Sequence, residues 1–386
     1  MSELKTLISQ LEDIALNPGK SVEKSVKDTG KEPIGCFPIY TPEEIVYAAG
    51  YLPVGMWGGK TEIKQADKYL QSFCCSIMRS NIEYGMKGTY DGLKAVIIPT
   101  FCDTLKCVCE NWKTAVPQVP VITVVYPQNR LLDAGYQYLV TEFNRIKDEI
   151  EKLKGEKISS KNMEKSFSIY ENYREAMRSF VKVVKDYPIT INTRTRHLII
   201  KAAYFMDKKD YTDIIIQIVN ELKNSSAENF NGIRVVATGL IGEPVELLNI
   251  FVENNIAVVA DDFAQESRQF RVQARNKGTA IEKMAYRIVD QKGCTFLYEE
   301  VKTKGQMLID MVKESKAQAV VVVMMKFCDP EEFDYPIIKE EIEKADIPML
   351  YIETDMQMDS YEQIRTRVQS FVHRNPSAYP FQYKAW

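Results

Sequence analysis

Short apolar runs alternate with amphipathic segments in the first third and in the last part of the chain. Eight runs are rich in apolar and β-branched residues, as is typical of strands buried on both faces. They lie at residues 34–40, 52–56, 95–99, 119–126, 233–238, 256–260, 319–324 and 349–353. Helical patterns separate them, and alternation of this kind predicts an α/β fold with parallel sheets covered by helices on both faces.

The middle of the chain, residues 131–229, has helical periodicity, many charges and few glycines. At 386 residues the chain is also too long for one ordinary core. We therefore predict an N-terminal amphipathic helix, a first α/β domain, a mainly helical segment between or beside the α/β domains, and a second α/β domain. Their predicted bounds are residues 1–30, 31–130, 131–230 and 231–386.

The two α/β parts carry a repeated motif. In each, an apolar strand is followed by Phe-Cys-Asp, at Phe101-Cys102-Asp103 and again at Phe327-Cys328-Asp329, and then by a helical pattern. The helix starts near residues 41–44 and 242–246 also correspond, the first with Thr41 as its predicted N-cap. The repeat predicts two similar Rossmann- or flavodoxin-like domains.

The composition of the chain limits the kinds of partner and compartment that we expect. The formal net charge is −3 and no basic stripe occurs, so we expect no nucleic-acid partner. We recognise no signal peptide, and no apolar run reaches membrane-spanning length, so we expect a cytoplasmic protein without a membrane anchor. In that compartment the eight cysteines should be reduced rather than paired. Only two histidines are present, so a bound metal would depend on thiolates.

The repeat places two cysteines where ligands bind in parallel sheets, which is at the carboxyl ends of the strands. Cys102 and Cys328 should face one cleft, each beside the positive N-terminus of a helix. A third thiol, from Cys74 or Cys75, would complete a site for a [4Fe-4S] cluster with one open iron. The competing interpretation is that these cysteines are ordinary core residues.

The remaining candidates receive weaker predictions. We expect Cys107 and Cys109 to be packing residues, since they do not share a helix face, and Cys294 to be structural. Cys36 ends a strand near the predicted cleft. The two histidines are interpreted as surface or packing residues, and the acidic strand ends at 261–262 and 353–355 as groups at the cleft rim with a structural or functional role.

Several motifs together resemble the 2-hydroxyacyl-CoA dehydratase and benzoyl-CoA reductase family, most closely the β-type subunits of 2-hydroxyisocaproyl-CoA dehydratase. The resemblance runs nearly end to end. Its carriers are Ile34-Gly35-Cys36-Phe37-Pro38, Thr41-Pro42-Glu43-Glu44, residues 52–59, Cys75-Ser76-Ile77-Met78-Arg79-Ser80, Cys102-Asp103-Thr104-Leu105, residues 258–262, Lys326-Phe327-Cys328-Asp329-Pro330, Glu353-Thr354-Asp355 and Arg365-Thr366-Arg367.

The resemblance implies a ligand set and a reaction. It places the three ligands of a [4Fe-4S] cluster on Cys75, Cys102 and Cys328. It implies elimination of water from an (R)-2-hydroxyacyl-CoA through a ketyl radical, with an electron supplied by a separate ATP-hydrolysing iron–sulfur activator. It also implies a heterodimer with a related α-type subunit. Residues 39–44 and 53–57 depart from the α-type substrate motifs, so the chain resembles the β-type, and no catalytic residue is assigned.

Three alternatives stay open at this point. The chain resembles subunits of ATP-dependent aromatic acyl-CoA reductases as well, which carry the same kind of cluster. A non-catalytic scaffold with structural cysteines would be colourless. A thiolate zinc site would need a closed tetrahedral ligand set and therefore a fourth ligand. The acyl group and the presence of a flavin are not specified by the sequence.

Overall fold

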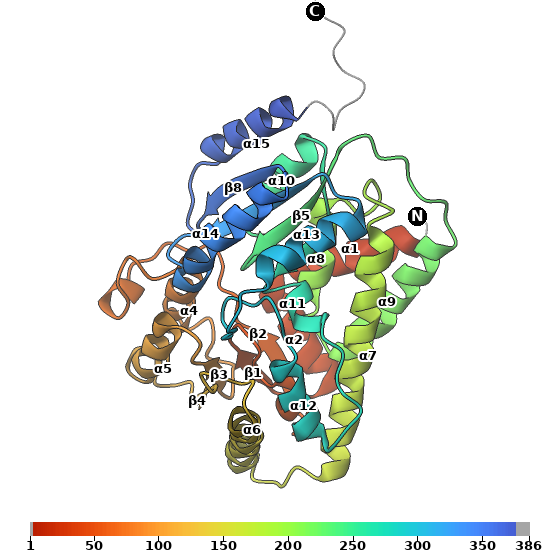
Figure 1. Ribbon diagram of the computed structural model, residues 1–386. Coiled ribbons are helices and arrows are strands. Elements are labelled where there is room, and N and C mark those ends of the chain that lie inside the picture. The colour runs from red at the N-terminus through yellow and green to blue at the C-terminus, as the bar shows by residue number, and fades with distance from the viewer. Residues whose placement is uncertain (1–2, 376–386) are drawn as a thin grey trace, which may run out of the picture.

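The computed structural model describes residues 3–375 and contains two four-stranded sheets in that range, with every strand pair parallel (Figure 1). The first sheet has the strand order β2-β1-β3-β4 and the second β6-β5-β7-β8, so the two sheets share one topology. The strands are β1 (Pro33–Cys36), β2 (Leu52–Gly55), β3 (Val96–Pro99), β4 (Val121–Val124), β5 (Ile233–Gly239), β6 (Ile256–Phe263), β7 (Ala319–Met325) and β8 (Met349–Thr354). The predicted α/β class and the eight strands are confirmed.

Two strand boundaries differ from the prediction for physical reasons. β1 ends at Cys36 instead of residue 40, because Pro38 has no amide hydrogen and Tyr40 adopts a left-handed φ of 63°. β6 continues past residue 260 to Phe263, so that two acidic residues lie inside the strand. Basic side chains from other elements pair with those carboxylates, as described below.

Helices connect the strands and cover the sheets. Those around the first sheet are α3 (Glu43–Ala48), the 3-10 helix η1 (Ala66–Lys68), α4 (Ser76–Met86) and α5 (Asp103–Ala115). Those that follow β5 are α10 (Val245–Glu253), α11 (Ser267–Phe270), α12 (Ala280–Val289), α13 (Lys304–Ser315), α14 (Asp329–Lys344) and α15 (Glu362–Arg374). The helix α3 begins after Pro42, one residue later than predicted, because the Thr41 hydroxyl donates to the Phe37 carbonyl instead of capping the helix.

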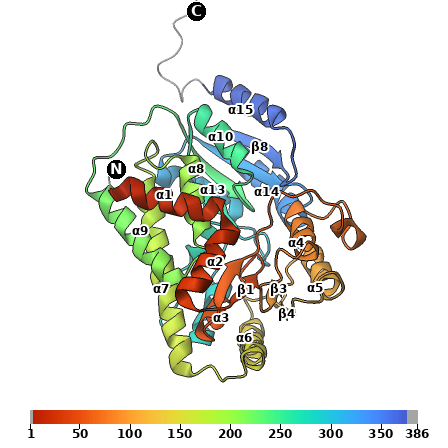
Figure 2. The same ribbon diagram turned by 180° about the vertical axis from the view of Figure 1, so that it is seen from behind.

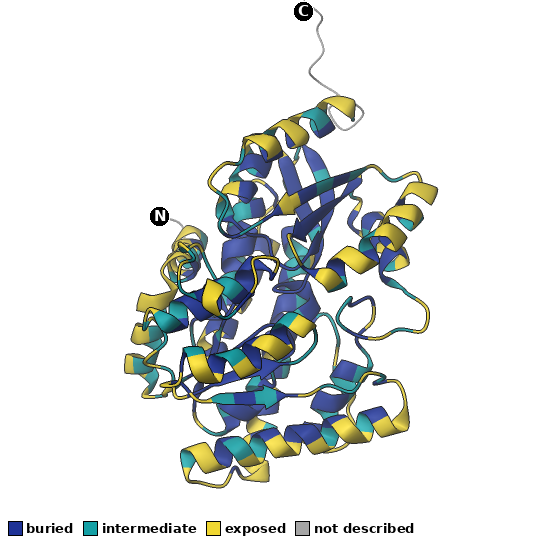
Figure 3. Ribbon diagram, turned by 90° about the vertical axis from the view of Figure 1, so that its left-hand side faces the viewer, coloured by how far each residue is buried: buried dark blue, intermediate teal, exposed yellow. Residues whose placement is uncertain are grey.

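The second sheet is buried on both faces, as its apolar strands require. Alternate residues of β7 point to opposite sides: Val321 and Val323 pack with α10 and α15, whereas Val320 and Val322 pack with α13 and α14. The strands are therefore almost entirely buried, and exposed residues lie mainly on the outer faces of the helices (Figure 3).

The middle and the N-terminus of the chain are helical. The long helices α6 (Asp133–Lys154) and α7 (Ser160–Val184) are followed by α8 (Thr193–Ala202) and α9 (Lys208–Lys223). The N-terminal α1 (Glu3–Leu16) buries Ile8, Leu11 and Ala15 against α8 and α9, and α2 (Pro18–Thr29) leads into the first sheet (Figure 2). None of the described helices has the length and apolar character needed to span a membrane.

Candidate functional site

The three cysteines predicted as ligands occupy equivalent local positions. Cys75, Cys102 and Cys328 are the N-cap residues of α4, α5 and α14. Cys102 follows β3 and Cys328 follows β7, which are corresponding strands of the two sheets. Three helix N-termini therefore carry a thiol at the first position outside the helix, where a negative charge is stabilised by backbone amides and the helix dipole.

All three thiols line one pocket between the two sheets. Its volume is about 520 Å³, counting space open to solvent. Apart from Cys75, Cys102 and Cys328, the lining is largely apolar: Pro38, Ile39, Trp57, Ile77, Met78, Thr104, Leu105, Leu240, Ala264, Phe296, Phe327, Asp329 and Pro330. The expected cleft is present, and Cys75 rather than Cys74 is the third thiol in it; the role of the three as ligands stays a prediction.

Backbone amides of the first helical turns face the sulfurs. The Leu105 amide donates to Cys102 Sγ at 3.5 Å. The Met78 amide donates to the Cys75 carbonyl at 3.1 Å, and its position in the first turn of α4 lowers the pKa of the Cys75 thiol. Burial nevertheless raises the pKa of the Cys75 thiol to about 12 and raises that of Cys102. Burial, and then the Glu331 carboxylate, raises the pKa of Cys328 well above its ordinary value. Thiols of this kind deprotonate when a metal centre compensates the negative charge.

The spacing of the thiols matters for the kind of metal centre. Among residues 3–375, no group of three or more His, Cys, Asp or Glu side chains is placed to hold one metal ion. Three ligands of a cluster bind three different irons, so their sulfurs lie further apart than the ligands of a single ion. The three thiols share one largely apolar pocket, and each lies at a helix N-terminus.

The other cysteines lie outside this pocket. Cys109 is buried and contacts the Ile98 carbonyl, and Cys294 is buried, in agreement with packing roles. Cys107 is exposed, so its predicted packing role was wrong: it lies on the outer face of α5. Cys36 is buried and contacts the Ile34 carbonyl, but it does not line the pocket.

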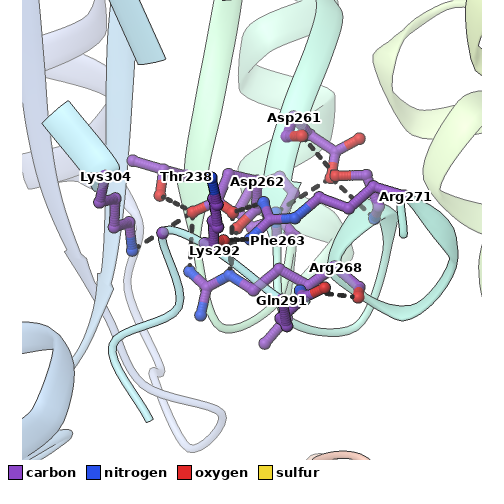
Figure 4. A network of polar contacts seen from close by, with 12 residues as sticks. Thr238, Asp261, Asp262, Phe263, Arg268, Arg271, Gln291, Lys292 and Lys304 are labelled. Atoms are coloured by element: carbon purple, nitrogen blue, oxygen red, sulfur yellow. Dashed lines mark hydrogen bonds and ion pairs between the residues drawn. The ribbon is translucent and has the colours of Figure 1, made fainter. Parts of the chain in front are cut away.

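The acidic pair at the end of β6 was expected at the cleft rim, but both carboxylates are buried. They belong to the network of polar contacts drawn in Figure 4. Asp262 pairs with Arg268 at 3.0 Å, with Lys304 at 3.3 Å and with Arg271. Burial alone would raise the pKa of Asp262, but Arg268 and Lys304 lower it. Asp261 pairs with Arg196. The expectation of a position at the cleft rim was therefore wrong: basic partners both near in sequence, such as Arg268, and far away, such as Lys304 and Arg196, bury the two carboxylates.

The network around Asp262 reaches the helix that carries Cys328. Arg268 and Lys304 each lie 2.8 Å from the carboxylate of Glu331, which belongs to the first turn of α14. Arg268, Lys304 and Glu331 are all buried. These ion pairs fix the start of α14 on β6, α11 and α13, behind Cys328. Local sequence patterns did not identify Arg268, Lys304 or Glu331. The position of Glu331, shortly after Cys328, was the only feature of the sequence that pointed to any of the three.

The histidines have different environments. His197 is buried, with Nδ1 at 2.8 Å from Glu266 and Nε2 at 3.1 Å from Glu243. Burial by itself lowers the pKa of His197, but the two carboxylates outweigh burial and raise it above its ordinary value. His373 is exposed on α15. The two histidines were predicted to be surface or packing residues. This is confirmed for His373, whereas the contacts of His197 with two carboxylates were not predicted.

A second cavity lies between α3, α7 and α12. It is lined by charged residues and tyrosines: Tyr40, Thr41, Pro42, Glu43, Glu44, Phe143, Tyr170, Tyr173, Arg174, Tyr204, Lys208, Gln269, Met284, Arg287 and Ile288. Glu44 pairs with Arg174 and lies 3.3 Å from Arg287, while Lys208 lies 3.3 Å from Glu43. The acidic and basic groups thus largely neutralise one another within the cavity.

Comparison with known proteins gives matches over nearly the whole chain. The family model described as "2-hydroxyglutaryl-CoA dehydratase, D-component" matches residues 38–374. The chain is 41% identical to the (R)-phenyllactyl-CoA dehydratase beta subunit of Clostridium sporogenes and 45% identical to the lactoyl-CoA dehydratase subunit beta of Anaerotignum propionicum; each match covers 96% of this chain and 99% of the relative. It is 34% identical to the (R)-2-hydroxyglutaryl-CoA dehydratase subunit beta of Acidaminococcus fermentans, over 95% of this chain and 98% of the relative.

Proposed function

Because the chain belongs to the 2-hydroxyglutaryl-CoA dehydratase D-component family, we propose that it is the β-type subunit of a 2-hydroxyacyl-CoA dehydratase, a hydro-lyase. The observation that carries this proposal is the identity of 41% and 45% to two relatives named as beta subunits of such enzymes, over almost their full length. The relatives differ in the acyl group that their names give, so the proposal extends to 2-hydroxyacyl-CoA as a class.

The finer proposal is that Cys75, Cys102 and Cys328 hold a [4Fe-4S] cluster. The pocket that the three thiols line supports it, because its walls are largely apolar and its three helix N-termini favour a negatively charged group. Such a cluster supplies one-electron transfer. The chain's own part is to provide three thiolates, to orient them through the first turns of α4, α5 and α14, and to limit access of water.

The reaction and partners follow from the same proposal. The electron would convert an (R)-2-hydroxyacyl-CoA, held mainly by a related α-type subunit, into a ketyl radical that loses water and returns the electron, giving a 2-enoyl-CoA. A separate ATP-hydrolysing iron–sulfur protein would deliver the first electron. The alternative, an aromatic acyl-CoA reductase subunit, has less support, since the three relatives compared above all have dehydratase names.

Anaerobic purification tests the cluster proposal. We expect a brown protein with about four irons per chain and a matching amount of acid-labile sulfide. Cys75→Ser, Cys102→Ser and Cys328→Ser should each lose iron. The matched controls Cys107→Ser, exposed, and Cys294→Ser, buried outside the pocket, should keep it. A colourless, iron-free wild-type protein would contradict the proposal.

Activity tests the role of the subunit separately. The loaded chain, mixed with an α-type subunit, an activator, ATP and a reductant, should dehydrate (R)-2-hydroxyacyl-CoA compounds such as the lactoyl or phenyllactyl thioester. The three cysteine variants should abolish turnover, whereas Cys107→Ser should support turnover close to wild type. Reduction of benzoyl-CoA without any dehydration would favour the reductase alternative instead.

A further inference from the structure

The two halves of the molecule meet beside the cysteine pocket along a set of hydrogen bonds. Residues 355–358, which follow β8, lie against the loop after β2. The Gln357 side chain accepts from the Thr61 amide at 2.9 Å and donates to the Gly59 carbonyl at 3.1 Å. The Lys60 ammonium donates to the Met358 carbonyl at 2.9 Å. We call residues 355–358 and their contacts the seam.

Ser76 extends the seam to the start of α4, next to Cys75. Its hydroxyl accepts from the Met356 amide at 3.0 Å and donates to the sulfur of Met325 at 3.3 Å. The side chain is only 1% exposed. It directly follows Cys75, whereas Met325 ends β7 and lies three residues before Cys328. One hydroxyl therefore connects the helix that begins after Cys75 with the strand that leads to Cys328.

The pocket depends on how these halves are held. Cys75 and Cys102 extend from elements of the first sheet, and Cys328 follows a strand of the second. The first turns of α4 and α14 line the same pocket. Two thiols from one half and one from the other keep a constant separation only if the contacts between the halves are fixed. Ser76 and Gln357 provide such contacts next to the thiols.

We propose that Ser76 is a positioning residue for the thiol site, and that its hydroxyl, supported by Gln357, sets the position of Cys75 relative to Cys328. This inference rests on the proposed cluster function. Groups that orient metal ligands without touching the metal contribute about 10- to 100-fold to metal affinity in other proteins. If the Ser76 hydroxyl only satisfied the buried Met356 amide, its removal would lower the free energy of unfolding but would not specifically change the release of iron.

Ser76→Ala and a matched control separate these two roles. Ser166 is also a 1% exposed serine with one long-range hydrogen bond, to the Glu44 carbonyl at 2.6 Å, but it does not line the pocket or the seam. Both variants of the full chain are purified without oxygen. Iron release to bathophenanthroline disulfonate, the electron paramagnetic resonance spectrum after dithionite reduction, and urea unfolding are measured for each variant and for wild type.

The expected result is iron release about ten-fold faster for Ser76→Ala than for wild type, with an altered resonance spectrum. Ser166→Ala should release iron at the wild-type rate with an unchanged spectrum, even where its unfolding midpoint is lowered. Equal rates and spectra for Ser76→Ala and wild type would overturn the inference and leave the proposed function intact. Faster release from both serine variants would overturn it too, because general destabilisation would explain the loss.

A second variant keeps the inference testable if Ser76→Ala does not fold. Gln357→Ala removes two seam contacts at a partly buried position and should also accelerate iron release, by a smaller factor. Iron release from Gln357→Ala at the wild-type rate would then overturn the inference. A wild-type chain that binds no iron would overturn the cluster proposal and this inference together, so the two failures are distinguishable.

Discussion

At the scale of single residues, the molecule combines thiols that a local motif marks with buried charges whose partners no motif marks. The three cysteines of the pocket, Cys75, Cys102 and Cys328, were found from a repeated motif and a family resemblance, and they line one pocket. The environments of Asp262 and His197 were not foreseen. A motif is local and can be recognised along the chain, whereas some partners of these buried charges, such as Lys304 for Asp262 and Glu266 for His197, come from segments far away in sequence.

The buried network behind Cys328 gives a prediction about stability. Arg268 is fully buried between Asp262 and Glu331, so Arg268→Met would leave two buried carboxylates with fewer positive partners. We expect a loss of about 3–5 kcal/mol in the free energy of unfolding. Urea unfolding followed by circular dichroism measures it. Arg365→Met, which removes a surface pair with Glu253, should cost about 1 kcal/mol or less; similar losses for both variants would contradict the prediction.

His197 predicts a pH dependence of stability. Its folded-state pKa is raised above the ordinary value of 6.5 by Glu243 and Glu266, against the effect of burial. A raised pKa stabilises the folded state fully below the unfolded pKa, and this contribution is lost as the pH rises through the folded pKa. Wild type should therefore lose more unfolding free energy than His197→Gln as the pH rises from about 6 to about 9.

Urea unfolding at a series of pH values tests this prediction. His373→Gln, which changes the other histidine of the chain, on α15, is measured as a comparison. Parallel profiles for wild type and His197→Gln would mean that His197 does not contribute the expected pH dependence. Arg196 and Lys201 stay beside Glu266 and Glu243 in all three proteins, so the comparison reports the change made at His197.

At the scale of helices and strands, periodicity predicted the elements well and their ends less well. All eight predicted strands exist, because a parallel strand buried on both faces needs a continuous apolar run. The predicted ends were wrong where one residue prevents the expected element from continuing or starting. Pro38 and Tyr40 end β1 early, and the Thr41 hydroxyl donates to the Phe37 carbonyl instead of capping α3. Such competition involves specific hydrogen bonds, which apolar patterns do not encode.

Helix capping gives a prediction at this scale. Ser159 is the N-cap of α7, and its hydroxyl accepts from the Asn162 amide at 3.1 Å. Ser159→Ala should cost about 1 kcal/mol of unfolding free energy, because the amide loses its partner. Ser168→Ala, at an exposed interior position of the same helix, should cost nothing or stabilise slightly, since alanine is the better helix former. Equal effects of the two substitutions in urea unfolding would contradict the capping role.

At the scale of the whole molecule, the repeat predicted two sheets of one topology, and the strand orders confirm it. The repeated Phe-Cys-Asp motifs have nevertheless diverged. Phe101 stacks on Tyr126 with ring centroids 4.1 Å apart, whereas Phe327 has a left-handed φ of 63° and is 43% exposed. The cysteines kept equivalent positions while the residues before them adapted to different neighbours.

Burial of the cysteines by the whole fold makes thiol labelling informative. Of the eight cysteines, Cys107 is exposed to solvent, Cys102 is half-buried and the other six are buried. We expect one fast-reacting thiol per native chain with a maleimide reagent, lost in Cys107→Ser, and labelling of all eight after unfolding and removal of any bound metal. Mass spectrometry of the labelled protein counts them. Fast labelling of several native thiols would contradict the burial described here.

The sequence by itself determined the class of the fold, the positions of its elements and the cysteines of the pocket, because strands, helices and short motifs depend on neighbouring residues. The tertiary structure decided which distant groups meet. Ser76 and Met356 are 280 residues apart in the chain, yet their hydrogen bond lies beside the thiols. Lys304 of α13 likewise reaches Asp262 of β6. Contacts of this kind arise only when elements that are distant in sequence pack together, so no local pattern specifies them.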